Sequence, residues 1–279
     1  MAKLLGGVTT SHIPAVGNAI NNGLTQDPYW KRFFDGYKPA HQWLEHNPAD
    51  IVIVVYNDHG LNFFLDKVPT FALGCADQYF NEDEGWGLPP RPPFPGDAEF
   101  SWHLAESLVA QEFDICTCQE MKVDHGFVNP IRVLYGDQKQ YKQKFIPLAV
   151  NTVQHPVPTA KRCLDLGVAL GKAIASYPDD VRVTIFGTGG MSHQLQGERA
   201  GFLDVDFDLE CMDKIAEDPK WFTQFSNTEI MARSGSEGIE TIMWLVMRGA
   251  LRADAKIVHK HYHAPISNTG AGVLVMDNQ

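Results

Sequence analysis

The chain has 279 residues, and its hydrophobic (44%) and charged (20%) fractions are typical of a folded globular protein, which excludes a disordered chain. It carries 23 Lys and Arg against 34 Asp and Glu, a formal net charge of −11. This balance excludes sequence-independent nucleic-acid binding and disfavours an anionic membrane surface, since both depend on basic side chains.

Apolar, β-branched runs predict five strands, at residues 4–10, 51–56, 146–150, 181–186 and 272–276. The run at 51–56 (IVIVVY) is unbroken, which is typical of a strand buried on both faces of a sheet. Helical spacing of apolar residues predicts a helix over residues 160–177. Ser234 and Glu237 predict a capping box that opens another helix, which ends near Gly249.

Strands alternate with helices along the chain, which predicts an α/β fold. We expect one domain over residues 1–279, with a central, largely parallel or mixed sheet flanked by helices and the active site at the strand ends. One segment departs from this alternation, because residues 81–97 (NEDEGWGLPPRPPFPGD) contain five prolines and three glycines. We predict a long ordered loop there, and a lid, a subunit contact and a surface excursion all remain open.

The cysteine content and the N-terminal segment together predict a cellular compartment. The chain has five cysteines, an odd number, and its first residues lack the apolar core of a signal peptide. No apolar stretch reaches the roughly 20 residues that a membrane span needs. We therefore expect reduced thiols, a cytoplasmic protein and no membrane partner.

Histidines stand where several predicted strands end. His12 follows the first strand, His59 the second, and His193 the glycine-rich turn after residues 181–186, while His125 lies in a VDHG segment. In open α/β sheets the ligand crevice lies beyond the carboxyl ends of the strands, so we expect these imidazoles to share one site.

Two neutral imidazoles and one carboxylate form a facial triad that suits non-haem Fe(II) working with O2, and a similar set serves catalytic zinc. Four carboxylates are candidates for the third ligand: Asp58, Asp124, Glu237 and Glu240. Glu240 lies beside an apolar helix face, where an unpaired carboxylate is costly, whereas Glu237 is explained by the predicted cap. Asp58 and Asp124 adjoin histidines and are also placed to orient the rings.

At this point the chain resembles the class III (LigB-type) extradiol ring-cleavage dioxygenases, and within them the protocatechuate 4,5-dioxygenase β subunit and the gallate and 3-O-methylgallate dioxygenases. The segments that carry the resemblance keep their order along the chain, at residues 10–15 (TSHIPA), 56–59 (YNDH), 83–87 (DEGWG), 123–126 (VDHG), 187–195 (GTGGMSHQL), 235–240 (GSEGIE) and 267–269 (SNT).

The resemblance implies roles for individual residues. His12, His59 and Glu240 match the Fe(II) ligands of the family, and the match selects Glu240 over Glu237. His193 matches the acid–base histidine, and His125 a second catalytic histidine near the substrate hydroxyl. Two further residues, Ser267 and Asn268, match those that hold the substrate carboxylate.

The resemblance also implies the function. We expect a catalytic extradiol dioxygenase that opens the ring of 3-O-methylgallate, protocatechuate or gallate with O2, in the catabolism of lignin-derived aromatic compounds. We expect a homo-oligomer, a dimer, and either a small α-type subunit or activity without one, since no fused extension follows the last predicted strand. A zinc-dependent hydrolase on the same ligands and a non-catalytic subunit of a dioxygenase complex remain as alternatives.

Overall fold

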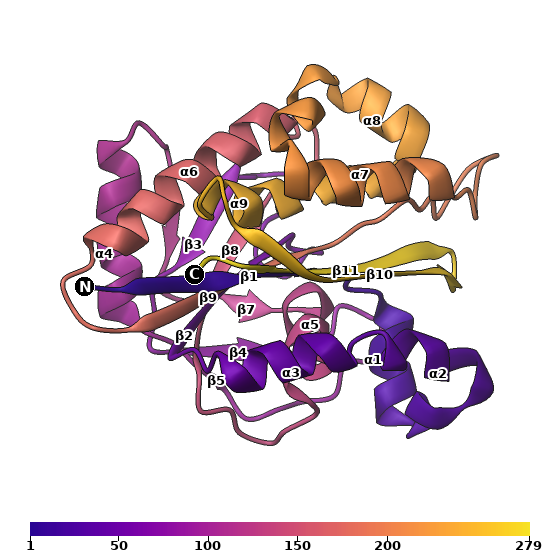
Figure 1. The fold of residues 1–279 in the computed structure, drawn as a ribbon, viewed down its shortest axis with the longest axis horizontal. Helices are drawn as coiled ribbons and strands as arrows, with labels where there is room; N and C mark the ends of the chain where they lie inside the picture. Colours follow the sequence, from indigo (N-terminus) through magenta and orange to yellow (C-terminus); the bar gives the residue numbers. More distant parts are fainter.

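One eight-stranded sheet runs through the middle of the protein, whose structure is a computed structural model that describes residues 1–279 (Figure 1). Its strands are ordered β10-β11-β1-β9-β2-β8-β3-β6. Their bounds are β1 Lys3–Thr10, β2 Ile51–Tyr56, β3 Phe71–Gly74, β6 Cys116–Cys118, β8 Lys144–Val150, β9 Arg182–Thr188, β10 Lys256–Ile266 and β11 Thr269–Asp277. A small second sheet pairs β5 (Phe94–Pro95), β4 (Gln78–Asn81) and β7 (Lys122–Val123) in that order.

The five predicted strands are confirmed as β1, β2, β8, β9 and β11. The central pairs β1–β9, β9–β2 and β2–β8 are parallel, while β11 and β10 join the sheet antiparallel. Since β1, β9 and β2 run in one direction, their carboxyl ends open onto the same edge of the sheet. The α/β prediction with a largely parallel, mixed sheet is therefore confirmed.

Helices cover both faces of the sheet (Figure 1). One face packs α4 (Ala98–Ala110), α6 (Ala160–Ser176), α7 (Val205–Glu217), α8 (Asn227–Ser234) and α9 (Ile242–Ala250). The other packs α1 (Pro14–Asn21), α2 (Pro28–Asp35), α3 (Lys38–His46) and α5 (His125–Tyr135). Short 3₁₀ turns lie at Leu24–Gln26, Pro219–Gln224 and Glu237–Thr241.

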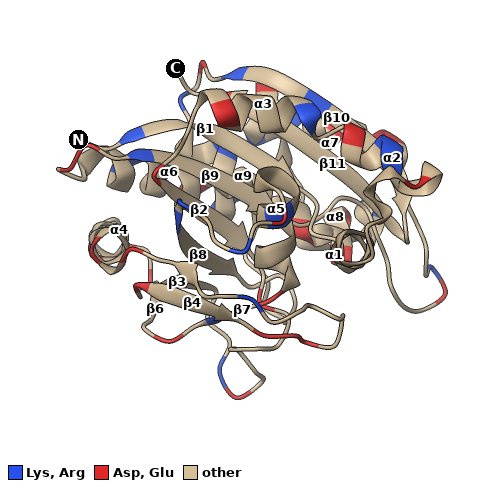
Figure 2. Cartoon of the chain, turned by 90° about the horizontal axis from the view of Figure 1, so that it is seen from below, with Lys and Arg blue, Asp and Glu red and all other residues tan.

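The fully buried strand β2 shows why this arrangement is stable. Ile51, Ile53 and Val55 point into the core under α6 and α9, while Val52 and Val54 point into the core on the α5 side. Alternate side chains of one apolar run thus fill two cores. Figure 2 shows the central strands almost without charged residues, which lie instead on the helices and loops outside.

The predicted capping box at Ser234 is wrong. Ser234 ends α8, its hydroxyl donates to the carbonyl of Ile230, and the capping box of this helix lies at Ser226 and Glu229. The Glu237 carboxylate instead accepts from the backbone N–H of Leu195. The predicted single helix is a 3₁₀ turn followed by α9, because Ser-x-x-Glu satisfies backbone donors only where a helix begins.

The proline-rich segment 81–97 is an ordered loop, as predicted, and it contains the short strand β5. Asn81 fixes the middle of the loop, since its amide oxygen accepts from the N–H of Arg91 and its amide nitrogen donates to the carbonyl of Pro89.

None of the helices is long and apolar enough to cross a membrane.

Candidate active site

A cavity of about 610 Å³ opens at the edge where β1, β2 and β9 end. It contains each histidine that the sequence predicted for a shared site, and Glu240 with them. No Lys or Arg lines the cavity. The lining side chains discussed below are His12, His59, His125, His193, Glu240, Trp86 and Ser267. The prediction that separate strand ends deliver imidazoles to one place therefore agrees with the geometry.

Three rings, those of His12, His59 and His193, are each held through Nδ1, and their Nε2 atoms lie near Glu240. The Nδ1 of His12 lies 3.0 Å from the hydroxyl of Thr188. That hydroxyl already donates to the carbonyl of Gly126 (3.3 Å), so it accepts from His12. The proton of neutral His12 therefore sits on Nδ1, and Nε2 carries the lone pair.

Asp124 holds His59 in the same way. Its Oδ2 accepts from the backbone N–H (2.7 Å) and from Nδ1 (3.0 Å) of His59, while Oδ1 accepts from the N–H of Gly126 and caps α5. The carboxylate is fully buried. The predicted role of Asp124 in orienting a histidine ring has this geometry behind it, and such a partner fixes the tautomer of a metal-binding imidazole.

The ring of His193 is oriented by its own loop. Its Nδ1 donates to the carbonyl of Met191 (2.9 Å), and Nε2 lies 3.9 Å from the carboxylate of Glu240. The loop is anchored by buried Asp208, which accepts from the N–H and hydroxyl of Ser192 and from the hydroxyl of Tyr262. Burial raises the pKa of Asp208 to about 6.

Glu240 is the carboxylate on which these rings converge. Its Oε2 lies 3.3 Å from Nε2 of His12, and its Oε1 lies 3.9 Å from Nε2 of His59. Asn57 donates to Oε1 and the N–H of Gly190 to Oε2, each at 3.0 Å. A buried carboxylate with two imidazole lone pairs facing it is a donor set that fits a divalent transition metal.

The electrostatics of the site reflect this crowding. Burial by itself raises the pKa of Glu240, but the nearby rings of His12, His193 and His59 outweigh it and hold the pKa well below its usual range. Burial lowers the pKa of His59, yet the charge and hydrogen bond of Asp124 raise it to about 9. The pKa of Asp124 is correspondingly lowered to about 2, against the effect of burial.

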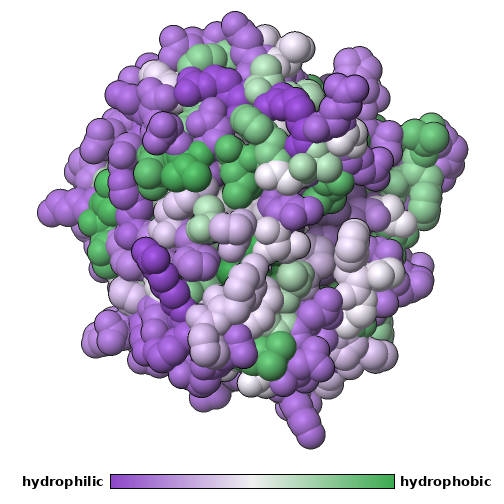
Figure 3. Space-filling view, turned by 90° about the vertical axis from the view of Figure 1, so that its right-hand side faces the viewer, coloured by the Kyte–Doolittle hydropathy of each residue, from purple (hydrophilic) through white to green (hydrophobic).

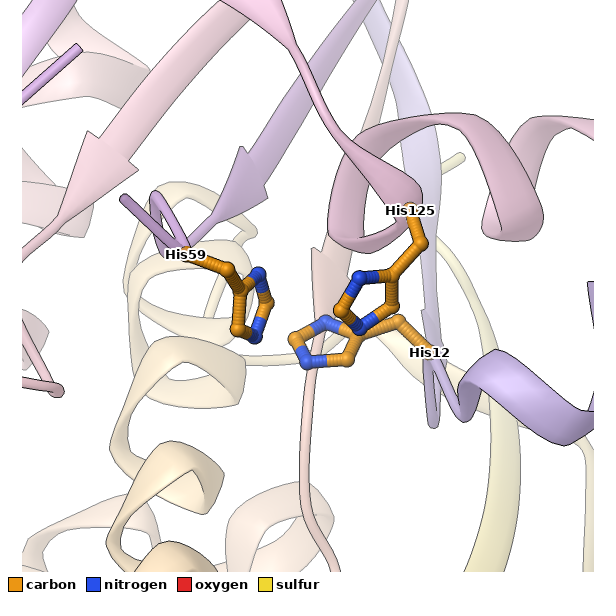
Figure 4. Close-up of side chains that lie close together, drawn as sticks. All are labelled: His12, His59 and His125. Atoms are coloured by element: carbon orange, nitrogen blue, oxygen red, sulfur yellow. The ribbon is translucent and has the colours of Figure 1, made fainter. Parts of the chain in front are cut away.

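His125 is the first residue of α5 and lies against the other rings. The ligand atoms of His12, His59 and His125 fall within 4.8 Å of one another, and Figure 4 shows the three rings facing a common centre from separate elements. The Nδ1 of His125 contacts the carboxylate of Glu84. Burial and the neighbouring His59 lower the pKa of His125 to about 4, which favours the neutral ring.

The remaining predicted residues lie at different distances from this centre. Ser267 lines the cavity from the turn between β10 and β11, while its neighbour Asn268 is exposed and lies outside the lining. The carboxylate of Asp58 accepts from the N–H groups of Gly60, Asn62 and Phe63, so it holds the turn after β2 and bonds to no histidine ring.

Sequence reasoning did not assign roles to Glu84, Thr188 or Asn57, which contact the rings or Glu240 directly. Glu84 and Thr188 lie within segments that carried the family resemblance, and Asn57 lies two residues from His59, so position along the chain was the available signal.

Figure 3 views the side of the molecule toward which β1 runs and shows apolar patches among hydrophilic side chains. Exposed Trp86, Val153 and Leu195 belong to both the surface and the cavity lining.

Most of the chain matches a known protein family. Residues 6–274 match the family described as the catalytic LigB subunit of aromatic ring-opening dioxygenase. The chain is 41% identical to a gallate dioxygenase of Pseudomonas putida over 197 residues, which are 71% of this chain and 58% of that protein.

Less similar relatives carry a different name, 2,3-dihydroxyphenylpropionate/2,3-dihydroxicinnamic acid 1,2-dioxygenase. The protein of this name from Mycolicibacterium smegmatis is 32% identical over 57% of this chain and 48% of its own length. The one from Comamonas testosteroni is 26% identical over 81% of this chain and 84% of its own. The matched part of the chain spans about half the length of the Pseudomonas and Mycolicibacterium proteins.

A solved structure supports the fold alone. The crystal structure of an uncharacterized protein from Escherichia coli K12 superposes with a TM-score of 0.58, covering 97% of this chain and 99% of that one at 12% identity.

Proposed function

The chain belongs to the family of catalytic LigB subunits of aromatic ring-opening dioxygenases, and from this premise we propose that it is an Fe(II)-dependent extradiol dioxygenase. Its substrate would be a protocatechuate-type dihydroxybenzoate, opened with O2. The observation that carries the proposal is the convergence of His12, His59 and Glu240, with both Nε2 atoms within 4 Å of one carboxylate.

These three residues would hold the iron on one side. Two neutral imidazoles and a carboxylate leave adjacent positions open, which is the arrangement of non-haem Fe(II) oxygenases. When bound, the iron would hold the two vicinal hydroxyls and O2 together and let electron density pass between them. The hydrogen bonds that the Nδ1–H groups of His12 and His59 donate to Thr188 and Asp124 would keep both rings in the ligating tautomer.

His193 would move the protons of the reaction. Its Nδ1–H is committed to the carbonyl of Met191, so Nε2 is free to take a proton from a substrate hydroxyl and return it later. Imidazole suits both steps because its ordinary pKa, near 6.5, lies close to neutrality. His125 would accept a hydrogen bond from the second hydroxyl through its own Nε2.

The substrate carboxylate would be held by neutral donors, because the cavity is lined by no Lys or Arg. Ser267 lies in the lining and Asn268 follows it at the tip of the same turn, so both stand where a ring substituent could reach the mouth. Hydrogen-bond donors without charge suit an anionic ligand in a chain of net charge −11.

A named relative supports the proposed substrate class. The Pseudomonas protein is named for gallate, so gallate, 3-O-methylgallate and protocatechuate, all compounds of lignin-derived aromatic catabolism, are the substrates to test first.

We also propose that the chain works as a homo-oligomer, a dimer, with or without a small α-type chain. The apolar residues Trp86, Val153 and Leu195 at the mouth are exposed and available to such a partner.

The test is anaerobic loading with Fe(II), followed by oxygen uptake and product spectra with each of the three substrates. We expect one O2 consumed per ring opened, and a ring-cleaved product absorbing differently from the catechol. Protein loaded with Zn²⁺ serves as the control and should consume no oxygen. Hydrolytic activity with zinc, and no oxygen uptake with iron, would instead support a hydrolase.

A further inference from the structure

We propose that Glu84 is a positioning residue for His125, holding the ring so that Nε2 presents a lone pair to a substrate hydroxyl. The role rests on the proposed function, since it concerns how His125 meets the substrate. Glu84 lies in the proline-rich loop, in the same turn as Trp86, and not at the end of a strand of the main sheet.

The contact is buried and involves more than the ring. One carboxylate oxygen of Glu84, Oε1, contacts Nδ1 of His125 and lies 3.4 Å from the backbone N–H of the same residue. Both side chains are only 4% exposed. Because a carboxylate only accepts, the Nδ1 of His125 must donate, and the neutral ring then has no proton on Nε2. Figure 4 shows the other ring nitrogen of His125 turned toward His12 and His59.

The small second sheet sets the register that brings the two residues together. In the parallel pair β4–β7, Asn81 lies opposite Val123, and the N–H of Glu82 donates to the carbonyl of Val123 (3.1 Å). Glu84 lies two residues after Glu82, and His125 lies two residues after Val123. The paired strands therefore bring Glu84 and His125 side by side. A shift of one residue would turn the carboxylate away.

The loop around Glu84 is held by its own hydrogen bonds. A single oxygen of Asp83, Oδ1, accepts from the N–H groups of Gly85, Trp86, Gly87 and Leu88. Gly85 and Gly87 have φ values of +107° and +82°, which other residues adopt only with strain. The carboxylate of Glu84 is thus carried by a rigid turn that also places Trp86 in the cavity wall.

The second oxygen of Glu84, Oε2, is buried and has no hydrogen-bond partner. Burying a carboxylate half-satisfied lowers stability, and unsatisfied buried polar groups are uncommon in folded proteins. A purely structural contact would not need this cost. The ring of His125 also lies 4.2 Å, centroid to centroid, from that of His59, so an unheld ring would have a second imidazole to bond with instead.

The experiment compares Glu84→Ala, Glu84→Gln and the matched control Glu82→Ala in the same loop. Glu82 is exposed and pairs with Lys122 on the surface, so its removal should leave both readouts unchanged. In metal-free, ¹⁵N-histidine-labelled protein, with His125→Gln assigning the signals, we expect wild-type His125 to carry its proton on Nδ1. Glu84→Ala should move part of that proton to Nε2, while Glu84→Gln, whose amide oxygen still accepts, should retain it.

In the iron-loaded enzyme, Glu84→Ala should lower kcat by about 10- to 100-fold with a much smaller change in KM, the range seen when a partner of an active-site histidine is lost. Glu84→Gln should recover most of that loss. An unchanged His125 tautomer in Glu84→Ala, or Glu84→Gln no better than Glu84→Ala, would overturn the positioning role. A chain that opens no ring would refute the proposed function, and the tautomer measurement would still decide the role of Glu84.

Discussion

The protein has two groups of histidines, and only one of them forms a site. His12, His59, His125 and His193 reach one cavity from the ends of β1, β2, β7 and β9. His259, His261 and His263 instead alternate along the single edge strand β10. The rings of His259 and His261 stack side by side with centroids 6.4 Å apart, while the cavity rings face inward.

The two groups differ most in what holds the rings. Each of these four histidines has Nδ1 bonded to an oxygen atom of the scaffold, and Glu240 lies among three of the Nε2 atoms. On β10, the Nε2 of His259 bonds to the carbonyl of Gly36, and the Nε2 of His261 is buried without a partner. Asp35, which lines a groove together with His259 and His261, is paired with Lys31 and Lys38. Metal-binding geometry therefore depends on convergence around an available carboxylate, and histidine number alone does not produce it.

Replacing Glu240 with alanine should have the largest effect on this comparison. It removes the carboxylate that the cavity group has and the β10 group lacks, so we expect iron binding to be lost. The loss should exceed the roughly 10- to 100-fold change that follows removal of a ligand's hydrogen-bond partner. Iron content after anaerobic loading measures it, with Glu237→Ala as the matched control. Loss of iron in Glu237→Ala and not in Glu240→Ala would reverse the assignment.

His193→Ala separates proton transfer from metal binding within the cavity group. The Nε2 of His193 lies 3.9 Å from Glu240, the same distance as the Nε2 of His59, so iron content has to tell a ligand from an acid–base residue here. We expect iron content to stay near wild type and turnover to fall by about 10²- to 10⁴-fold, the usual contribution of a general acid–base residue. Iron content and oxygen uptake on the same sample check this, and a parallel fall of both would make His193 a ligand.

Asp124→Asn tests the bond that distinguishes His59 from the β10 histidines. The asparagine keeps the shape of the side chain but weakens the hold on Nδ1, so we expect iron affinity to fall by about 10- to 100-fold. Competition with a chelator of known affinity measures the change. Asp58→Asn, which alters only the neighbouring turn, should leave the affinity unchanged, and an equal loss there would remove the special role of Asp124.

The pH dependence of metal binding should also follow from Asp124. Its charge raises the pKa of His59 to about 9 in the metal-free protein, so a metal must displace a proton below that pH. Apparent affinity should therefore rise with pH, by about tenfold per unit between pH 7 and 9, and level off above. In Asp124→Asn the pKa falls and the slope should flatten above neutrality. A wild-type affinity independent of pH over this range would contradict the raised pKa.

The smallest effect is expected on β10. The ring of His261 packs against Gly36, and His261 lines an exposed groove together with residues of α2. His261→Ala should leave iron content and turnover unchanged and alter the free energy of unfolding by less than about 1 kcal/mol. Metal analysis and chemical denaturation check both values. A second equivalent of iron in wild type that disappears in His261→Ala would show that the β10 group is a site after all.

Much of the sheet could be predicted because its strands are apolar runs that only a doubly covered sheet can bury. The strand β2 was predicted with its observed bounds, Ile51–Tyr56, and α6 to within one residue. Short or polar elements were missed: β10 carries two lysines and histidines at every second position from 259 to 263, and β3 and β6 have four and three residues. Their positions depend on pairing with neighbours, which leaves little local pattern.

The sequence by itself determined that the protein is an α/β domain with imidazoles at successive strand ends, because burial patterns and turn residues are local properties. Residue spacing left open which carboxylates those imidazoles meet; the family resemblance selected Glu240, and the tertiary structure decided the pairings. Glu240, Glu84 and Asp124 come from a 3₁₀ turn, a proline-rich loop and a helix cap, and each lies far along the chain from its histidine or nearest ring partner. Their hydrogen bonds depend on strand register and chain crossing, which side-chain spacing does not encode.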